Sequence, residues 1–255
     1  PVLFPIVGSL WDKKYRVDGK EYSLEQHGFA RDMDFHLVSS DENTLWYELK
    51  SDAETLAKYP YAFTLKIGYK LTGNKIQVMW EASNNDGKTM YFQIGAHPAF
   101  YYPDFNPDTE ERGAFRLYKR GENGEMKPLE TLKYILISEK GCADTEHVYE
   151  LETPEGKLPL TTSTFDRDAL IIENKQVSKV VLESCAGEPF VSVEFDSPAL
   201  GMWSPSGLNA PFVCIEPWYG RCDRKGFTGP LDEKDLVNAL APGQVFRTGY
   251  TIEVF

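Results

Sequence analysis

Several features that define other classes of protein are missing from this sequence. No uninterrupted apolar run approaches the roughly 20 residues that a membrane-spanning helix needs, so we expect no membrane partner. No charged-then-apolar leader of the secretory kind, internal repeat or low-complexity run is apparent. Helix patterns are also scarce, and in the C-terminal half only residues 232–240, followed by Pro242-Gly243, look helical. The predicted protein is therefore built mainly of strands.

Cysteine and histidine are sparse as well. The four cysteines (Cys142, Cys185, Cys214 and Cys222) form no CxxC pair, and only four histidines are present. Zinc-site spacing is absent, and so few cysteines cannot form the disulfide scaffold of a small secreted protein. We therefore expect no metal site, and the reducing cytoplasm as the location.

Basic charge is the third deficit. The chain carries 27 Lys and Arg against 39 Asp and Glu, a formal net charge of −12. Nucleic acids and anionic membranes both require basic surface, so neither is an expected partner. The remaining composition, 42% hydrophobic and 26% charged, is that of an ordinary globular protein. A chain of this length can bury a large core without disulfides.

What is present is a succession of strand patterns. Apolar and polar residues alternate over residues 63–71 and again over 76–83, and the turn Thr72-Gly73-Asn74 lies between them. This pattern predicts a hairpin with one apolar and one polar face. A second turn then leads to a strand at residues 90–94. We expect these three strands to form a meander.

Other segments complete the expected fold. Further strands are predicted at residues 45–50, 169–172, 179–182, 191–195, 212–215 and 250–254, with a tight turn at 17–20. Residues 51–54 (SDAE) have capping-box spacing for a short helix that Pro60 would end. Residues 104–127 are rich in charge, Gly and Pro, and are expected to form a long loop. About a dozen short strands with almost no helix predict an all-β protein, a large antiparallel β-sandwich forming one domain over residues 1–255.

A histidine follows the third of these strands, in residues 95–102 (GAHPAFYY). Pro98 biases His97 toward an extended backbone, and Gly95 allows close approach of another segment or a ligand. A histidine at a strand end beside aromatic rings is suited to moving a proton on a bound sugar. The same residues also fit a histidine that is merely satisfied by hydrogen bonds in a strand-to-loop corner.

A carboxylate occupies a similar position later in the chain, in residues 212–223 (FVCIEPWYGRCD). Glu216 ends an apolar strand, and carboxylates are rarely buried without a partner or a task. Desolvation beside Trp218 would raise its pKa. The alternative is a structural salt bridge between Glu216 and Arg221 or Arg31.

These two stretches belong to a larger resemblance. Together with residues 26–32 (QHGFARD), 164–171 (TFDRDALI) and 200–204 (LGMWS), in the same order, they resemble the aldose 1-epimerase (galactose mutarotase) family, and its LacX-like branch most closely. The resemblance covers nearly the whole chain. It implies a galactose mutarotase-like supersandwich, and it implies that the family's first strands, which precede the segment matching residues 1–5, are lacking here.

The resemblance also implies an activity. Aldose 1-epimerases interconvert the α and β anomers of a free aldose by opening and reclosing the sugar ring. Opening needs a proton taken from O1 and a proton delivered to the ring oxygen O5, so Glu216 would be the base and His97 the acid. The roles reverse on closure, and pKa values not far from neutral serve best. Neither a metal nor a nucleotide is needed, so we expect no cofactor.

Two further polar residues are expected to bind the sugar. Arg31 aligns with an arginine that contacts sugar oxygens in the family, against the alternative of an ion pair with Asp32 or Asp34. Asp168 fits a position that binds sugar hydroxyls, although Asp166 would serve as well.

The aromatic residues and the other histidines leave more alternatives open. Trp203 and Trp218 are expected to stack on the apolar face of a pyranose, or else to fill the core. Galactose mutarotases proper carry a second active-site histidine after the first. The downstream candidate here, His147, lies in a polar setting and is expected to be solvated and non-catalytic. His36 and His27 are expected to be structural, with His27 a candidate for lining the cleft.

Two other functions stay open. A hexose-6-phosphate 1-epimerase of the same fold would need arginines at the cleft mouth, and Arg31 and Arg221 are the main candidates in an acidic chain. A non-catalytic carbohydrate-binding or regulatory sandwich would keep the cleft without the activity, although the pair of His97 and Glu216 argues against it. The sequence specifies neither the natural sugar nor whether the protein is a monomer or a homodimer.

Overall fold

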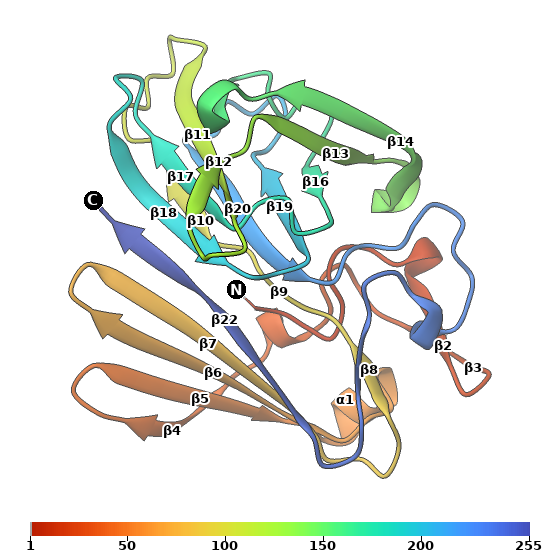
Figure 1. Cartoon of the computed structure of the whole chain (residues 1–255). Helices are drawn as coiled ribbons and strands as arrows, with labels where there is room; N and C mark the ends of the chain where they lie inside the picture. The colour runs from red at the N-terminus through yellow and green to blue at the C-terminus, as the bar shows by residue number, and fades with distance from the viewer. Residues whose placement is uncertain (1) are drawn as a thin grey trace.

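The computed structural model describes residues 2–255, which form two large antiparallel sheets that pack against each other (Figure 1). Every pair of named strands is antiparallel, and the described residues contain 22 strands but one α-helix. The all-β, antiparallel prediction is therefore confirmed, although about a dozen strands were expected. None of the helices in the described part of the chain is long and apolar enough to cross a membrane.

The first sheet has eight strands and carries the candidate site. In spatial order its strands are β1 (Val2–Leu3), β9 (Ile94–Ala96), β20 (Phe212–Tyr219), β19 (Ala199–Trp203), β16 (Leu170–Ile172), β13 (Thr131–Ile137) and β14 (Ala143–Glu152), with β10 (Ala99–Tyr101) also paired to β20.

The second sheet has ten strands and closes the other side of the core. In spatial order these are β12 (Met126–Pro128), β11 (Glu111–Arg120), β17 (Lys179–Glu183), β18 (Pro189–Phe195), β22 (Val245–Val254), β7 (Lys75–Asn84), β6 (Phe63–Thr72), β5 (Thr44–Lys50) and β4 (His36–Ser40), with β15 (Lys157–Thr161) paired to β11.

Small elements complete the fold. Two short antiparallel pairs are the hairpin of β2 (Lys14–Val17) with β3 (Lys20–Ser23), and the long-range pair of β8 (Met90–Phe92) with β21 (Asn238–Leu240). Single 3₁₀ turns cover Trp11–Lys13, Ala30–Asp32, Glu139–Gly141, Pro154–Gly156 and Leu231–Glu233. The one α-helix, α1 (Ala53–Lys58), has a capping box in which Asp52 and Thr55 bond each other's backbone N–H. The box therefore begins one residue later than the sequence spacing suggested.

The core between the sheets decides which side chains face the site. Val213 and Ile215 of β20 pack into one buried cluster with Leu182 of β17 and Val193 of β18. Because side chains alternate along a strand, the intervening residues of β20 point to the opposite face of the eight-stranded sheet. Cys214, Glu216 and Trp218 therefore lie together on the face turned away from this core.

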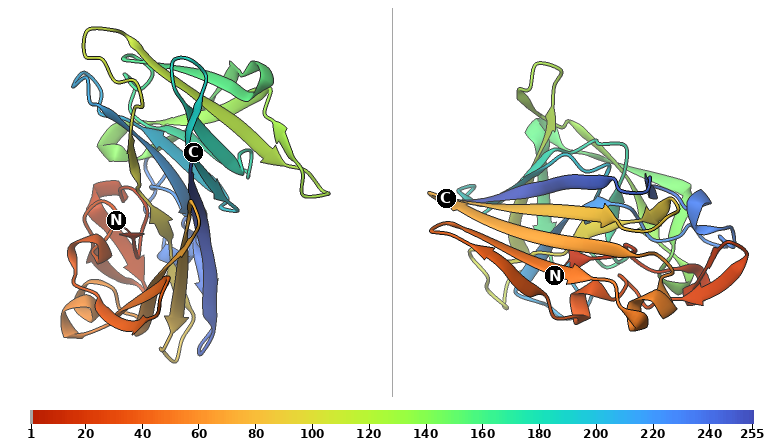
Figure 2. Two further views of the ribbon diagram at one scale, coloured as in Figure 1. Left: turned by 90° about the vertical axis from the view of Figure 1, so that its left-hand side faces the viewer. Right: turned by 90° about the horizontal axis from the view of Figure 1, so that it is seen from below.

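The predicted meander is only half correct. Strands β6 and β7 form the expected hairpin, but β7 pairs on its other side with β22 from Val245↔Ser83 to Glu253↔Lys75. Figure 1 and Figure 2 show the dark-blue β22 running beside the orange β7. The third strand leaves this sheet, because β8 pairs with β21 and β9 pairs with β1 and β20.

The loop predicted at residues 104–127 is wrong. This segment contains the ten-residue strand β11 and the start of β12. Phe115 and Leu117 of β11 are fully buried, whereas Arg116 points outward and pairs with Glu183 of β17. The charges that suggested a loop are thus the outer face of an amphipathic strand.

The helix predicted at residues 232–240 is also wrong. The segment forms a single 3₁₀ turn followed by β21. Lys234 is buried and donates to Asp223 at 2.5 Å, and Asn238 donates to the carbonyl oxygens of Phe92 and Tyr219. These long-range contacts override the local helix propensity.

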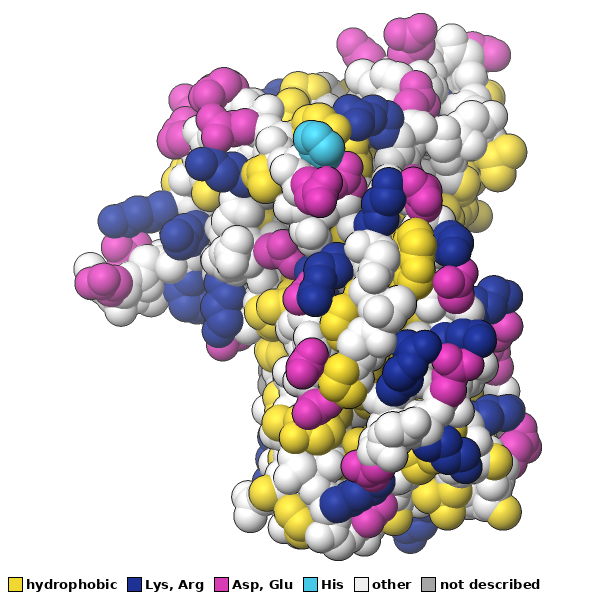
Figure 3. All heavy atoms as spheres, turned by 90° about the vertical axis from the view of Figure 1, so that its right-hand side faces the viewer, with side chains coloured by type: hydrophobic (Ala, Val, Ile, Leu, Met, Phe, Trp, Pro, Cys, Tyr) yellow, Lys and Arg dark blue, Asp and Glu magenta, His cyan; other side chains and the backbone are white. Residues whose placement is uncertain are grey.

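The outer surface fits the acidic composition. On the face shown in Figure 3, acidic and basic side chains are interspersed, with apolar atoms between them.

We predict that Lys234→Met destabilises the protein strongly. The change leaves the buried carboxylate of Asp223 without its cation, which costs about 3–5 kcal/mol. Urea unfolding followed by circular dichroism measures the loss. Lys225→Met is the matched control, because Lys225 pairs with Glu139 in an exposed position and should hardly matter. Equal effects of the two changes would contradict the prediction.

Candidate active site

The strand register places His97 directly beside Glu216. On one side of His97, Gly95 pairs with Trp218, and on the other side Ala99 pairs with Cys214. The register is unchanged between these pairs, so His97, in the short link between β9 and β10, lies across from Glu216. The Pro98 carbonyl accepts a hydrogen bond from the Ile215 N–H at 3.3 Å, which holds the link against β20.

On the other side of Glu216 the paired residue is a glycine, which leaves room above the sheet for a neighbouring ring. Gly201 of β19 pairs with Glu216, and a Cβ there would lie 2.3 Å from the Trp218 ring. A Cβ on Gly95 would also meet this ring, at 2.8 Å. The indole of Trp218 therefore lies flat over two glycines, one on each neighbouring strand, and forms part of the floor beside the carboxyl group.

The Glu216 carboxyl group is enclosed by protein. Its side chain is only 3% exposed. The Oε2 atom makes no hydrogen bond within the described residues, nor does Nε1 of Trp218. Burial raises the pKa of Glu216 well above its usual value, and the Trp218 N–H opposes this shift without forming a hydrogen bond of good geometry. The carboxyl group therefore holds its proton more tightly than an ordinary glutamate.

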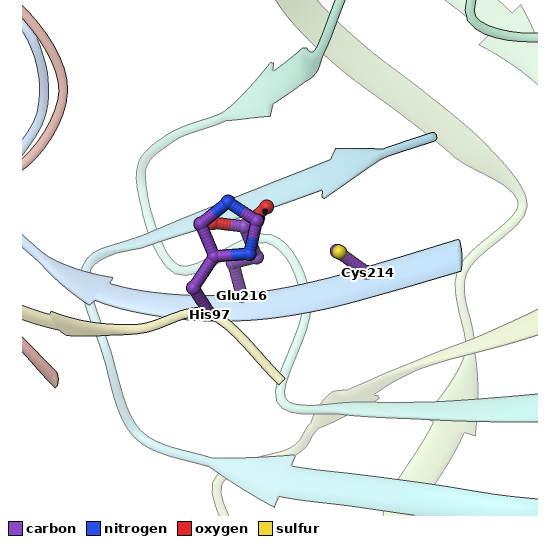
Figure 4. Close-up of side chains that lie close together, drawn as sticks. All are labelled: His97, Cys214 and Glu216. Atoms are coloured by element: carbon purple, nitrogen blue, oxygen red, sulfur yellow. Dashed lines mark ion pairs between the residues drawn. The ribbon is translucent and has the colours of Figure 1, made fainter. Parts of the chain in front are cut away.

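His97 faces this carboxyl group. Its Nδ1 lies 3.4 Å from Oε1 of Glu216, and Figure 4 shows the imidazole standing over the carboxyl group. The ring of Trp203 meets the imidazole edge-on, with 5.8 Å between the ring centroids. Burial lowers the pKa of His97 to about 4, and the charge of Arg31 adds a smaller contribution in the same direction. Without a bound sugar, a neutral imidazole beside a protonated carboxyl group is therefore the favoured state of His97 and Glu216.

Both groups line one cavity of about 360 Å³, a size typical of small-molecule sites. The structure brings all six residues singled out in the sequence to this cavity. They are Arg31, His97, Asp168, Trp203, Glu216 and Trp218. Two basic side chains, two acidic side chains and two indoles thus converge from five separate segments of the chain.

The two predicted binding residues lie at the rim. Arg31 is exposed in the turn Ala30–Asp32, and its Nε lies 3.4 Å from Oδ2 of Asp32, so the ion-pair alternative is present but long. Asp168 precedes β16 and accepts the N–H of Ala169 at 2.7 Å. Asp166, the alternative to Asp168, does not line the cavity.

The salt-bridge alternative for Glu216 is wrong. Arg221 is buried and donates instead to Glu173 and Asp235, at 2.6 Å each. His147 is exposed and pairs with Asp144 at 2.8 Å, as its polar surroundings suggested. His147 is not among the residues that line the cavity.

Some cavity residues had no clear signal in the sequence. Gly8 and Gly141 come from segments without a motif, and only the fold brings them to the site. His27 had a signal, because it lies in the same short block as Arg31. It is the second imidazole of the cavity, and its ring centroid is 5.6 Å from that of His97.

A larger cavity, of about 550 Å³, lies elsewhere on the eight-stranded sheet. It is open, and its lining includes Lys133, Val148 and Asn174. The smaller cavity combines convergent polar groups with shifted pKa values, so we assign the candidate active site there.

One group of side chains resembles a metal site at first sight. Single ligand atoms of His97, Cys214 and Glu216 lie within 4.8 Å of one another. Burial raises the pKa of both the Cys214 thiol and the Glu216 carboxyl group. Because cations bind the deprotonated forms, these donors suit proton transfer better than metal binding.

The fold agrees with what known proteins share. Residues 1–225 match the family model of the aldose 1-epimerases. The chain therefore belongs to the aldose 1-epimerase family, as its motifs predicted.

Named relatives point the same way. The chromosomal protein LacX of Lactococcus lactis subsp. lactis is 30% identical over 261 residues, covering 100% of this chain and 84% of LacX. A galactose mutarotase related enzyme from Lactobacillus acidophilus has a TM-score of 0.89 at 32% identity, covering 100% of this chain and 82% of that one. A galactose mutarotase-like protein from Lactobacillus casei ATCC 334 has a TM-score of 0.90 at 28% identity, covering 100% and 84%.

We predict that Glu216→Gln stabilises the fold, and more so as the pH rises. The pKa of Glu216 is higher in the folded state than its unfolded value of about 4.5. The free energy of unfolding of the wild type is therefore highest below about pH 4.5, and it falls as the pH rises and the unfolded chain loses this proton. A glutamine has no such loss. The melting temperatures of both proteins at pH 5 and pH 8 test this, with exposed Glu42→Gln as the control. An equal difference at both pH values would count against a buried, protonated carboxyl group.

Proposed function

We propose that the protein is an aldose 1-epimerase that interconverts the α and β anomers of a free aldose in this cleft. One observation carries the proposal. Nδ1 of His97 lies 3.4 Å from Oε1 of Glu216 in a cavity that suits one small molecule. Anomer exchange needs one group to take a proton from O1 and another to give a proton to O5, and an adjacent carboxyl–imidazole pair supplies both.

The pair needs only one proton for the whole cycle. In the empty cleft that proton resides on Glu216, because burial raises the pKa of the carboxyl group and lowers that of His97. Its transfer to His97 yields a carboxylate to act on O1 and an imidazolium to act on O5. During ring opening Glu216 takes the proton of O1 and His97 gives its proton to O5, so the carboxyl group is protonated again and the imidazole is neutral. After rotation about C1–C2, closure on the other face runs the same transfers in reverse.

The rim and floor supply the binding contacts. Arg31 donates to sugar oxygens, and the carboxylate of Asp168 accepts from sugar hydroxyls. Trp203 is half-buried and offers an indole face for stacking on the pyranose, whereas Trp218 is buried and serves as floor. A few polar groups on an apolar lining are the usual design of a small-molecule site.

A phosphorylated sugar fits this cleft less well. Arg221 is fully engaged with Glu173 and Asp235, which leaves Arg31 as the one arginine or lysine among the residues that line the cavity. The same lining includes the carboxyl groups of Asp168 and Glu216. A free aldose is therefore the favoured substrate class.

A purely sugar-binding protein is disfavoured for an energetic reason. Burying a carboxyl group that leaves Oε2 without a hydrogen bond costs free energy. A binding site can hold hydroxyls with exposed or fully paired groups and has no need of this cost. Proton transfer in a water-poor site does need such a group.

We predict that Glu216→Gln lowers the rate of anomer exchange by about 10²–10⁴, since an amide cannot take or give the proton. Polarimetry of freshly dissolved α-glucose and α-galactose measures the rate. Sugar affinity should change little. The control is His147→Ala, which should be silent because His147 is exposed and outside the cavity. Full activity of Glu216→Gln would remove Glu216 from the mechanism.

The pH dependence of kcat/KM offers an independent test. The pair gains a second proton when His97 is protonated, which its lowered pKa sets at about 4. Between about pH 5 and 7 the rate should therefore stay level, and it should fall as the pH drops below about 4. Circular dichroism at each pH separates inactivation from unfolding. A half-maximal point near 6.5, the usual value for histidine, would contradict the protonation state described here.

A further inference from the structure

His27 is held in the cleft by a reciprocal clamp to Gly8. The His27 N–H donates to the Gly8 carbonyl at 2.9 Å, and the Gly8 N–H donates to the His27 ring nitrogen Nδ1 at 3.0 Å. Gly8 has a φ of +70°, and a Cβ there would lie 2.5 Å from the Cys222 side chain. Glycine is therefore required at this position, and the clamp fixes both the place and the orientation of the imidazole.

The clamp also fixes which ring nitrogen carries the proton. Nδ1 accepts the Gly8 N–H, so it has no hydrogen of its own, and the neutral ring must carry its proton on Nε2. Nε2 has no hydrogen-bond partner within the described residues. It is not among the sealed side-chain atoms, unlike Oε2 of Glu216 and Nε1 of Trp218. A fixed and unused N–H donor thus opens onto the cavity beside His97.

We infer that His27 is a sugar-binding residue, which donates a hydrogen bond from Nε2 to an oxygen of the bound aldose. The inference rests on the proposed function, because it takes an aldose as the occupant of the cleft. The second imidazole of the site thus comes from a residue upstream of His97, in the same short sequence block as Arg31.

The charges around His27 keep the contact neutral. Burial first, then the neighbouring His97 and Arg31, lower the pKa of His27 to about 3. The acidic groups of the same cavity are Asp168 and Glu216. A donor that stays uncharged at ordinary pH suits the hydroxyl or ring oxygen of a neutral sugar, and its contribution does not change with pH.

Two substitutions separate this role from a merely structural one. His27→Asn places an amide oxygen where Nδ1 stood, so it keeps the Gly8 bond, and asparagine tolerates the φ of 69° at this position. It removes the donor at Nε2. His27→Gln does the opposite, because its longer side chain carries an N–H close to the place of Nε2 but loses the Gly8 bond.

The two variants should therefore show crossed effects. His27→Asn should keep the wild-type melting temperature but bind the sugar roughly tenfold more weakly, with kcat/KM reduced by a similar factor at every pH from 5 to 8. His27→Gln should melt at a lower temperature but keep most of the affinity. A structural role alone predicts the reverse, with His27→Asn equal to the wild type in affinity and kcat/KM.

Affinity and rate are measured separately, by NMR titration with glucose and galactose and by polarimetry. Weaker binding by His27→Asn supports the inference even if the wild type proves to bind sugar without interconverting its anomers, a result that would overturn the proposed epimerase alone. Equal binding by His27→Asn and wild type overturns the role of His27 alone. A wild-type protein that binds neither sugar overturns both.

Discussion

The whole site depends on one buried carboxyl group in the middle of a sheet. Glu216 lies on β20, between His97 on one side and Gly201 on the other. Its burial beside an unpaired indole N–H is costly by itself. The cost is tolerated because the other face of β20 contributes Val213 and Ile215 to a large core, which fixes the strand whatever lies above it.

This arrangement divides one strand between two tasks. Alternate side chains of β20 enter the core, and those between them face the cleft. The glycines on the neighbouring strands leave that face flat, so the indole of Trp218 can lie on the sheet beside the carboxyl group. A low-dielectric floor then shifts the pKa of Glu216 upward and that of His97 downward, which places the one shared proton on Glu216 in the empty cleft. In the proposed chemistry this proton passes to His97 before the sugar ring opens.

The walls of the cleft come from loop segments that pack on the core and are also tied together by hydrogen bonds. The side chain of buried Gln93 accepts a hydrogen bond from the Val7 N–H and donates one to the Asp235 carbonyl. These bonds tie the segments around Val7 and Asp235 to the residue that precedes β9, the strand that leads to His97. The Gly8–His27 clamp adds a second tie. The rim is thus held by hydrogen bonds between loops in addition to packing.

Local sequence patterns were sufficient to predict the residues on the floor of the cleft but not the contacts that form its walls. Strand alternation and the position of Pro98 predicted where His97 and Glu216 lie along their strands, and the resemblance to a family paired them. Neither source predicted the clamp on His27, because it depends on a contact with a segment that has no motif.

The sequence also did not predict which strands distant along the chain pair with each other. The pairing of β7 with β22, the strand at residues 111–120 and the extended segment around Lys234 all depend on contacts distant in sequence. A charged outer face looks like a loop, and a short amphipathic run looks like a helix, until the opposing strand is known.

The most direct test of the account is a crystal structure of the protein with glucose or galactose bound. The account predicts a single pyranose in the cavity of about 360 Å³, with O1 within hydrogen-bond distance of the Glu216 carboxyl group and O5 within reach of His97. A sugar seated instead in the cavity lined by Lys133 and Asn174, or one with O1 and O5 turned away from both groups, would contradict it.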